Sequence, residues 1–375
     1  KEGPASMSAV WKWLKKEAVL AIAALCALVS ALFVPPSLAY VDYLDLRVLC
    51  LLFCLMVVVA GFRSLGVFSV LTQRLLGGRR RLRVLVLLLV FLPFFFSMFI
   101  TNDVALIAFV PFALLTLGLA GSRRYLLRVV VLQTIAANLG SMLTPFGNPQ
   151  NLYLYSYYQM RIGDFFGALG LYTLASLALL ALCCLFFPNK TLELSFSQRA
   201  SISSPLDVWL FLALFLVCLV SVLRLVHYLI PLALVVLVCL LRAPKLLKEA
   251  DYSLLLTFVC FFVFSGNMGN IPAVQDFFSR CMDFSPIGTA ILSSQIISNV
   301  PSAVLLSRFT SDGASLLIGT NLGGLGTLIA SLASLISFRF YAAEKDAKPA
   351  AYLGVFTLYN LAFLFLLALP ALLCA

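Results

Sequence analysis

The feature that most constrains this chain is a succession of apolar stretches, several of which reach the roughly 20 residues that a helix needs to cross a bilayer. Apolar residues make up 63% of the 375 residues and charged residues only 11%, whereas a soluble domain carries about a quarter charged residues. Because lipid offers no water to backbone polar groups, each crossing segment must satisfy them internally. The stretches therefore predict an all-α polytopic membrane protein.

The basic residues indicate the orientation of the chain. The formal net charge is +11, and the positive side chains gather in short loops, as in Arg79-Arg80-Arg81 and Arg123-Arg124. Such loops face the cytoplasm. We expect an integral protein of a prokaryotic inner membrane, with a cytoplasmic N-terminus and no binding of nucleic acid. The ten cysteines show no zinc-type spacing, and we expect no cofactor other than Na⁺ or H⁺ as a coupling ion.

With the basic loops on the cytoplasmic side, the chain divides into four parts. Residues 1–17 are a cytoplasmic segment whose first six residues resemble an added tag ahead of Met7, and a polar linker at 188–206 separates two membrane regions, 18–187 and 207–375. Two stretches, 84–119 and 284–312, begin and end on the same side, as re-entrant hairpins or as pairs of steep crossings. We expect nine further crossings, at 18–34, 46–62, 125–158, 165–187, 207–226, 228–241, 252–266, 314–340 and 350–372.

One polar motif occurs in both membrane regions. Asn138-Leu139-Gly140-Ser141-Met142-Leu143-Thr144 returns without a gap at 321–327, as Asn-Leu-Gly-Gly-Leu-Gly-Thr. Asn148 and Asn151 then fall opposite Ser331 and Ser334. The first hairpin opens from the cytoplasm and the second from outside, so the regions are predicted to be inverted repeats. Polar breaks repeated in this way indicate the binding site of a transporter.

A second polar element precedes each copy of this motif. Thr101-Asn102-Asp103 lies in the first hairpin and Ser298-Asn299-Val300-Pro301 in the second, at a similar depth. Further upstream, Gly61 corresponds to Gly266. The order of these elements is the same in both regions, which supports the repeat.

The repeated motif is predicted to interrupt a helix in each region. In 125–158, Pro145 and Pro149 remove backbone donors and disfavour helix in the residue before them. In 314–340, Gly323, Gly324 and Gly326 supply flexibility instead. Carbonyl oxygens at such breaks suit Na⁺, and the N-termini of half-helices suit an anion.

Asp103 is the only acidic residue deep within an apolar stretch. A carboxylate there is energetically costly and by default functional, as a proton carrier or a cation ligand. A protonated acid with a structural role is the alternative.

Together these residues resemble the ion-transporter superfamily that includes divalent-anion/sodium symporters, citrate transporters and arsenite permeases. The resemblance covers roughly 44–341 and rests on the two hairpin pairs, the Gly-Asn-Pro-Gln-Asn run at 147–151 and the motif at 321–324. It implies two re-entrant hairpins, two broken helices and an elevator movement of the substrate-binding part against a scaffold, and it suggests a homodimer.

The same resemblance implies a set of site residues. Asn102 and Asn299 would touch the substrate, with Thr101, Ser298 and Pro301 beside them. The resemblance would place the coupling cations at Asn138, Gly140, Asn148, Asn321, Gly323 and Thr327, and the residues themselves add Asp103, Thr144, Asn151 and Ser331 to this set. The first tip reads Thr-Asn-Asp rather than Ser-Asn-Thr, as on the arsenite-permease and sodium–proton antiporter side, so H⁺ at Asp103 stays an alternative to Na⁺.

The leading hypothesis is a secondary active transporter, not an enzyme, that moves a small anion coupled to Na⁺ or H⁺. The anion would be a di- or tricarboxylate or an inorganic oxyanion. A sodium–proton antiporter or an arsenite-type efflux permease is the alternative within transport, although an antiporter is expected to bury several carboxylates. A lipid-modifying enzyme would need a catalytic cluster that the sequence lacks, and a channel would need a continuously lined pore.

Overall fold

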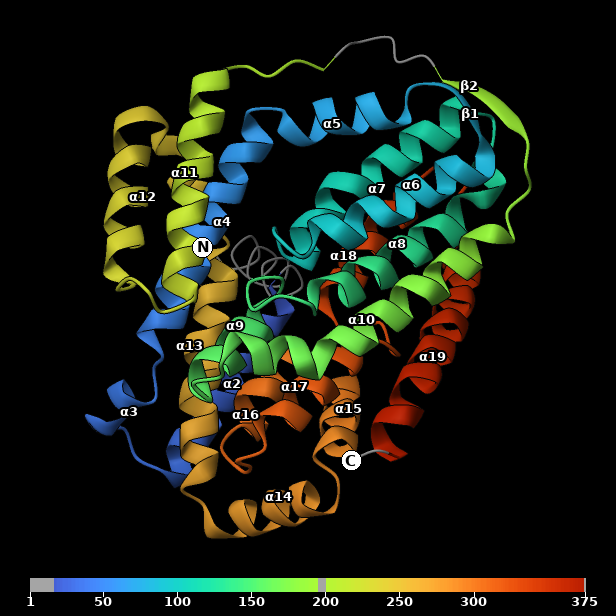
Figure 1. Ribbon diagram of the computed structural model, residues 1–375. Coiled ribbons are helices and arrows are strands. Elements are labelled where there is room, and N and C mark those ends of the chain that lie inside the picture. The colour runs from blue at the N-terminus through green and yellow to red at the C-terminus, as the bar shows by residue number, and fades with distance from the viewer. Residues whose placement is uncertain (1–16, 195–199, 374–375) are drawn as a thin grey trace, which may run out of the picture.

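The computed structural model describes residues 17–194 and 200–373 (Figure 1). The predicted tag and residues 7–16 lie outside the described residues, as does 195–199 of the linker. Helices form almost all of the described structure, and six of them have the length and composition to cross a membrane. The prediction of an all-α polytopic membrane protein is confirmed, apart from two four-residue strands.

The first half runs from α2 to α10. The predicted hairpin 84–119 corresponds to α6 and α7, and the predicted broken helix 125–158 corresponds to α8 and α9. The elements are α2 (Ala18–Phe33), α3 (Ala39–Asp42), α4 (Leu46–Ser64), α5 (Val67–Leu76), β1 (Gly78–Arg81), α6 (Leu82–Phe96), α7 (Asn102–Leu119), η1 (Arg123–Tyr125), α8 (Leu126–Ser141), α9 (Pro149–Tyr157) and α10 (Ile162–Leu185).

The second half repeats the succession of hairpin, broken helix and long helix. The hairpin consists of α15 and α16, and the broken helix of α17 and α18. The elements are β2 (Thr191–Leu194), α11 (Pro205–Val222), α12 (Leu229–Arg242), η2 (Pro244–Glu249), α13 (Tyr252–Gly269), α14 (Pro272–Phe284), α15 (Pro286–Ile297), α16 (Asn299–Leu306), α17 (Gly313–Leu322), α18 (Leu332–Ala342) and α19 (Pro349–Leu373).

Local sequence explains where several helices begin. Asn148, Ser204 and Ser285 each accept a hydrogen bond from a backbone N–H in the first turn of the following helix, and each is followed by proline. A polar N-cap satisfies an otherwise unpaired donor, and proline is favoured at the first helical position because its missing N–H is not needed there. The helices α9, α11 and α15 are therefore positioned by dipeptides that the sequence already displays.

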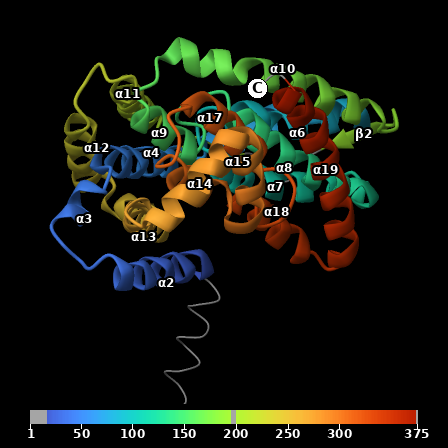
Figure 2. The ribbon, with the colours of Figure 1, turned by 90° about the horizontal axis from the view of Figure 1, so that it is seen from below.

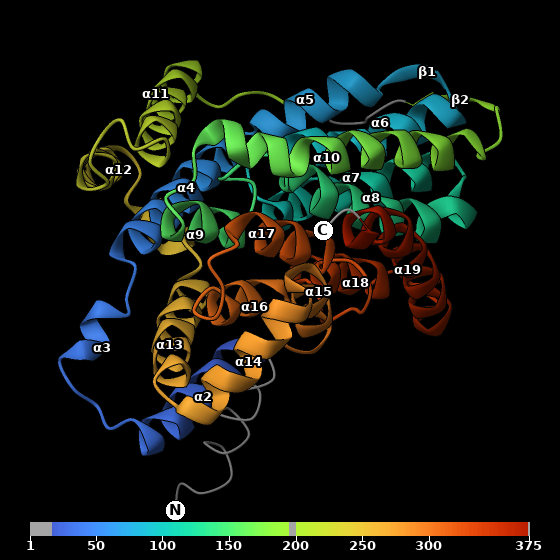
Figure 3. The same cartoon turned by 60° about the horizontal axis from the view of Figure 1, so that its bottom comes forward.

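The two halves exchange packing partners. Helix α2 of the first half packs against α13, and α11 and α12 of the second half pack against α4. Figures 2 and 3 show these helices grouped on one side of the molecule, with α6, α7, α8, α10, α18 and α19 on the other. Because Gly61 in α4 has no side chain, the ring of Phe211 packs directly against it, and the ring of Tyr43 packs in the same way against Gly266 in α13. The two glycines that correspond in sequence thus each admit an aromatic ring from the other half.

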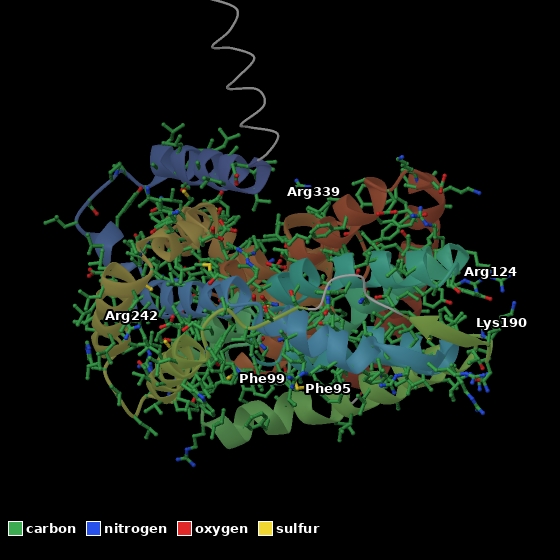
Figure 4. The ribbon with its side chains drawn as sticks, turned by 90° about the horizontal axis from the view of Figure 1, so that it is seen from above. Phe95, Phe99, Arg124, Lys190, Arg242 and Arg339 are labelled. Atoms are coloured by element: carbon green, nitrogen blue, oxygen red, sulfur yellow. The ribbon has the colours of Figure 1, made fainter. Side chains whose placement is uncertain are left out.

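Basic residues mark one end of the molecule, called here the basic end. It carries α5, β1 and β2, whereas α14 lies across the opposite end (Figure 1). Figure 4 looks onto the basic end and labels Arg124, Lys190, Arg242 and Arg339. The loops predicted to be cytoplasmic at Arg79–Arg81, Arg123-Arg124 and Arg242 thus share one end of the structure.

Two elements were not among the expectations. The first lies in the linker 188–206, where residues 191–194 form β2, which pairs antiparallel with β1 and places Arg80 opposite Leu192. Strand pairing satisfies the backbone groups of both segments. The second is α14, an amphipathic helix between the predicted crossing 252–266 and the predicted hairpin 284–312, where no element was expected. Its charged residues lower its mean hydropathy below that of a membrane-crossing stretch.

Candidate functional site

The two hairpin tips have the same backbone conformation. Thr101 (φ 54°, ψ 149°) and Ser298 (φ 74°, ψ 155°) are both in a region that non-glycine residues rarely adopt, and each precedes the first residue of a helix. Such strain persists only where surrounding structure enforces it, and it is common at functional sites. The tips therefore place Asn102 and Asn299 as the first residues of α7 and α16.

Each tip is bound to the break of its own half through equivalent atoms. The backbone N–H of Asn102 donates to the Gly147 carbonyl (3.2 Å), and that of Asn299 donates to the Ala330 carbonyl (3.0 Å). Gly147 and Ala330 occupy the same position relative to Asn138 and Asn321. The sequence repeat is thus matched by a repeated contact between hairpin tip and broken helix.

The first break, 142–148, is organised by one buried amide. The Asn151 side-chain nitrogen donates to the carbonyls of Met142 and Thr144, both at 3.1 Å, and to that of Ser141 at 3.4 Å. The Thr144 hydroxyl in turn donates to the Met98 carbonyl of the hairpin (2.5 Å). Carbonyls that end α8 are thereby satisfied without a regular helix.

The second break, 323–331, uses an amide that the sequence analysis missed. Gln295 of α15 donates from its side-chain nitrogen to the carbonyls of Gly323 and Leu325, both at 2.9 Å, and its oxygen accepts from the Thr327 backbone N–H (2.8 Å). Gly326 has a φ of 108°, and a side chain there would overlap with the Gln295 amide. An isolated glutamine three residues before the Ser298-Asn299 pair was the available signal.

The two breaks meet in a buried network of side-chain amides. Asn138 accepts from Asn102 (2.9 Å) and from the Ser331 hydroxyl (3.0 Å). Asn148 donates to the Asn321 oxygen (3.1 Å), and Asn321 donates to Asn151 (2.6 Å). In the repeat, Asn138 corresponds to Asn321 and Asn148 corresponds to Ser331. The Asn138–Ser331 and Asn148–Asn321 hydrogen bonds therefore join the same pair of equivalent positions twice across the halves.

Glycines allow the helices at this centre to approach closely. A side chain at Gly140 would overlap with the Phe94 carbonyl of α6, and one at Gly323 would lie 2.7 Å from the Ser294 hydroxyl of α15. Each broken helix can therefore press against the first helix of its own hairpin. In the structure these two positions act through packing; their predicted part in a cation site stays a prediction.

Several polar atoms at the centre are buried without a hydrogen-bond partner among the described residues. They include Asp103 Oδ1, Asn138 Nδ2 and Ser334 Oγ. A buried polar atom without a partner costs about 1–3 kcal/mol, so such atoms call for an explanation. A ligand that offers both a cation and an anion would satisfy a carboxylate oxygen and an amide nitrogen together.

A cavity of about 490 Å³ lies beside this centre. Its lining includes Thr101, Asp103 and Pro149 of the first tip and break, together with Arg63, Glu249 and Arg339. Arg63 is paired with Glu249 at 2.6 Å, whereas the Arg339 guanidinium has no ion pair with any described residue. Asp103 thus lines the cavity, while one of its oxygens is fully buried.

The predicted site residues fall into five groups, apart from Gly140, which packs against α6. Asn102, Asn138, Asn148, Asn151, Asn321 and Ser331 form the amide network. Thr101 and Asp103 line the cavity. Thr144 fixes the first tip to its break, and Ser298, Asn299, Gly323 and Thr327 surround the second tip, with Thr327 exposed. Pro301 is buried within α16, away from the network.

Comparisons with known proteins show the family of the chain. The chain is 32% identical over 289 residues to the "Inner membrane protein YbiR" of Escherichia coli, with 76% of this chain and 77% of that protein covered. It is 31% identical over 301 residues to the "Uncharacterized transporter MJ0456" of Methanocaldococcus jannaschii, with 77% and 79% covered. Residues 7–315 match the family described as "Citrate transporter". The chain is therefore a membrane transporter rather than an enzyme, and it belongs to the citrate transporter family.

Proposed function

We propose that this protein is a secondary active transporter that moves a small anion, with citrate as the first candidate, coupled to Na⁺ or H⁺. One observation carries the proposal: both strained hairpin tips contact the helix breaks, and the breaks are joined by the amide network. Irregular backbone at membrane depth is tolerated only where it is buried in protein or lines a cavity. Here the irregular backbone of both breaks is largely buried, and Thr101 of the first tip lines a cavity that Asp103 also lines.

The substrate anion would lie between the two hairpin tips. Helices α7 and α16 both begin there, and helix N-termini attract negative charge. The Asn299 side-chain nitrogen has no hydrogen bond with any described residue and lies where a side chain on Gly324 would be 2.8 Å away. That amide is a free donor for a carboxylate or an oxyanion.

Asp103 would bind the coupling ion. Its unpartnered oxygen lies beside the first tip and it lines the cavity, so a proton or a Na⁺ arriving from the basic end reaches it directly. Neutralising this carboxylate would also reduce its repulsion of an anion at the neighbouring tip. Charge compensation of this kind would couple movement of the ion to movement of the anion.

Transport would proceed by alternating access between inverted repeats. The basic end would be cytoplasmic, with the N-terminus on the same side, because loops rich in arginine and lysine remain there. The hairpins and broken helices would move as an elevator against α2, α4, α11, α12 and α13, in a homodimer. Helix α2 of the first half packs mainly against α13 of the second half, and α11 and α12 of the second half pack against α4 of the first. This exchange of packing partners supports the division.

A sodium–proton antiporter is the second candidate, and the charges of the cavity favour it. The lining holds four carboxylates, Glu17, Asp103, Glu249 and Asp251, against the two guanidinium groups of Arg63 and Arg339. An excess of acid attracts cations. The amide network and the helix N-termini would then have a structural role only.

The test is uptake of radiolabelled citrate into proteoliposomes under an imposed Na⁺ or pH gradient, with thermal stabilisation by a panel of anions measured in parallel. A ligand that binds the folded state raises the melting temperature by mass action. We expect gradient-driven uptake and stabilisation by citrate or another panel anion. Stabilisation by Na⁺ or by pH alone, with Na⁺/H⁺ exchange and no anion uptake, would replace this proposal with the antiporter.

A further inference from the structure

Both helix breaks have carbonyl groups that are occupied by a side-chain amide. Asn151 donates to three carbonyls of the first break, and Gln295 donates to those of Gly323 and Leu325 in the second, both at 2.9 Å. Gly323 and Leu325 are buried. Carbonyl oxygens at breaks of membrane helices are typical ligands of Na⁺. Each amide nitrogen therefore binds oxygens that a cation at the same break would need.

The contacts of Gln295 fix the orientation of its amide. The side-chain oxygen accepts from the Thr327 backbone N–H at 2.8 Å. A reversed amide would place its oxygen against two carbonyl oxygens and its nitrogen against an N–H group, and neither contact is a hydrogen bond. Gly326, with a φ of 108°, leaves room for the amide, because a side chain there would overlap with it. The second break is thus shaped around the Gln295 amide.

The two amides reach the breaks from different elements. Asn151 lies in α9, within the first broken helix, whereas Gln295 lies in α15, the first helix of the second hairpin. The repeat places Ser334 at the position of Asn151 and Met98, which also stands three residues before its tip, at the position of Gln295. Ser334 Oγ is buried without a hydrogen-bond partner among the described residues. Gln295 therefore supplies from the hairpin the donor that the second half lacks at position 334.

The two hairpin tips also differ in charge. Asp103 lies in the first tip, and Val300 takes its place in the second. Asp103 Oδ1 is buried without a hydrogen-bond partner among the described residues. Between residues 284 and 343 the only acidic residue is Asp312, and its carboxylate caps α17 by accepting from the Ser315 N–H. The first tip thus offers a cation an uncommitted carboxylate oxygen, whereas the second offers no carboxylate.

We infer that Gln295 takes the place of a second coupling ion, so that each transport cycle carries one coupling ion, bound at Asp103. The Gln295 nitrogen gives the carbonyls of Gly323 and Leu325 the donors that a cation would otherwise replace, and it holds the second tip to its break with no ion bound. At the first break Asn151 holds the carbonyls, and the ion binds at the carboxylate instead. This inference rests on the proposed function, in which Asp103 binds the coupling ion.

The substitution Gln295→Glu tests this inference, because it keeps the shape of the side chain and replaces the donor by a carboxylate oxygen. That oxygen would face the carbonyls of Gly323 and Leu325 and repel them unless a cation lies between. The substitution is made in the Asp103→Asn background, which removes any response of the first tip. The control is Gln275→Glu in the same background, at an exposed position of α14.

The first measurement is the melting temperature at alkaline pH in NaCl and in choline chloride of equal ionic strength. We expect Gln295→Glu to melt several degrees lower in choline and to recover in Na⁺, since an ion that binds only the folded state stabilises it by mass action. Asp103→Asn alone and the Gln275→Glu control should melt at the same temperature in both salts. If the glutamate variant does not fold, Gln295→Ala opens the same carbonyls to a cation and is measured in the same way.

The second measurement counts ions during transport. With Asp103 intact, uptake against the concentration of the coupling ion should give a Hill coefficient of about one for the wild type and a value above one for Gln295→Glu, because the coefficient is limited by the number of sites. A wild-type coefficient near two, or Na⁺ stabilisation that persists in Asp103→Asn protein, would overturn the inference. So would a Gln295→Glu variant that melts lower and does not respond to Na⁺.

Failure of the proposed function gives a different result. If the wild-type protein takes up no anion under any gradient, anion transport is refuted. The melting temperatures of the Gln295 variants do not depend on transport, and they would still decide whether this amide occupies the place of an ion.

Discussion

The side-chain nitrogen of Asn148 donates to the side-chain oxygen of Asn321 at 3.1 Å, and this bond joins the two helix breaks across 173 positions of sequence. Asn321 also donates to Asn151, so one residue of the second half satisfies two amides of the first. Asn148 and Asn151 are almost completely buried, so neither side-chain amide can form a hydrogen bond with water instead if Asn321 is replaced.

Replacing Asn321 by alanine should therefore destabilise the fold. Two buried amides lose a partner, and each loss is worth about 1–3 kcal/mol. We expect the free energy of unfolding to fall by about 2–4 kcal/mol, measured by thermal or denaturant unfolding in detergent. Asn189→Ala, at an exposed position of the linker, is the matched control and should leave stability unchanged. Equal stability of the two variants would show that the network contributes little.

The two tip asparagines should respond differently to truncation. Asn102 bonds to Asn138, so Asn102→Ala should lower both stability and uptake. The Asn299 amide nitrogen is a free donor, so Asn299→Ala should reduce anion uptake about 10- to 100-fold while the melting temperature stays within about one degree. Uptake and unfolding are measured on the same preparations. Full activity of Asn299→Ala would remove this amide from the substrate site.

Gly324 offers a way to obstruct the site without removing any donor. A side chain there would lie 2.8 Å from the Asn299 nitrogen and 3.3 Å from the Asn321 carbonyl. We expect Gly324→Ala to reduce anion uptake several-fold, because the added methyl group displaces the Asn299 amide. Gly354→Ala in α19 is the control, since nothing lies within 4 Å of the added atom. If both alanine variants transport at the wild-type rate, the space beside Gly324 is not part of the substrate path.

Asp103→Asn tests the coupling ion. The amide has the shape of the carboxyl group but neither titrates nor carries a charge. We expect that a Na⁺ or pH gradient no longer drives accumulation, while exchange of labelled for unlabelled anion continues. The measurement is net uptake against counterflow in the same proteoliposomes. Gradient-driven accumulation that survives the substitution would make Asp103 a structural acid.

Gly140 tests the packing of the first broken helix. A methyl group there would collide with the Phe94 carbonyl, which is backbone and cannot turn aside. Gly140→Ala should destabilise the protein by about 1–3 kcal/mol or prevent folding. Gly167→Ala in α10, where the added atom meets nothing within 4 Å, should instead be neutral or stabilise by up to about 1 kcal/mol through helix propensity. Thermal unfolding of the two variants gives the comparison.

The sequence predicted those parts of the site that depend on local chemistry. Proline and glycine at 145–149 and 323–326 interrupt helices in any surroundings, so both breaks were predictable, and the repeat identified Asn138 and Asn321 before any fold was known. Membership of a transporter family confirms the broad function. The positions of Thr101 and Ser298 at hairpin tips follow from the same polar interruptions.

The parts that were missed depend on contacts between distant segments. Gln295 is one amide in an apolar stretch, and nothing local shows that its nitrogen reaches Gly323 and Leu325. Arg308 reads as an ordinary loop residue until Tyr43 is placed beside it. Helix α14 was missed for a different reason, because its apolar face alternates with charged residues and its mean hydropathy stays low.

The packing of α2 against α13 has a consequence for biosynthesis. Helix α2 ends at Phe33 and α13 begins at Tyr252, so about 220 residues must be synthesised before the two can meet. At 5–20 residues per second this interval is on the order of 10–40 s. Until then α2 lacks the helix against which it packs most extensively. Assembly of the scaffold is therefore a late event, which waits for synthesis of the second half.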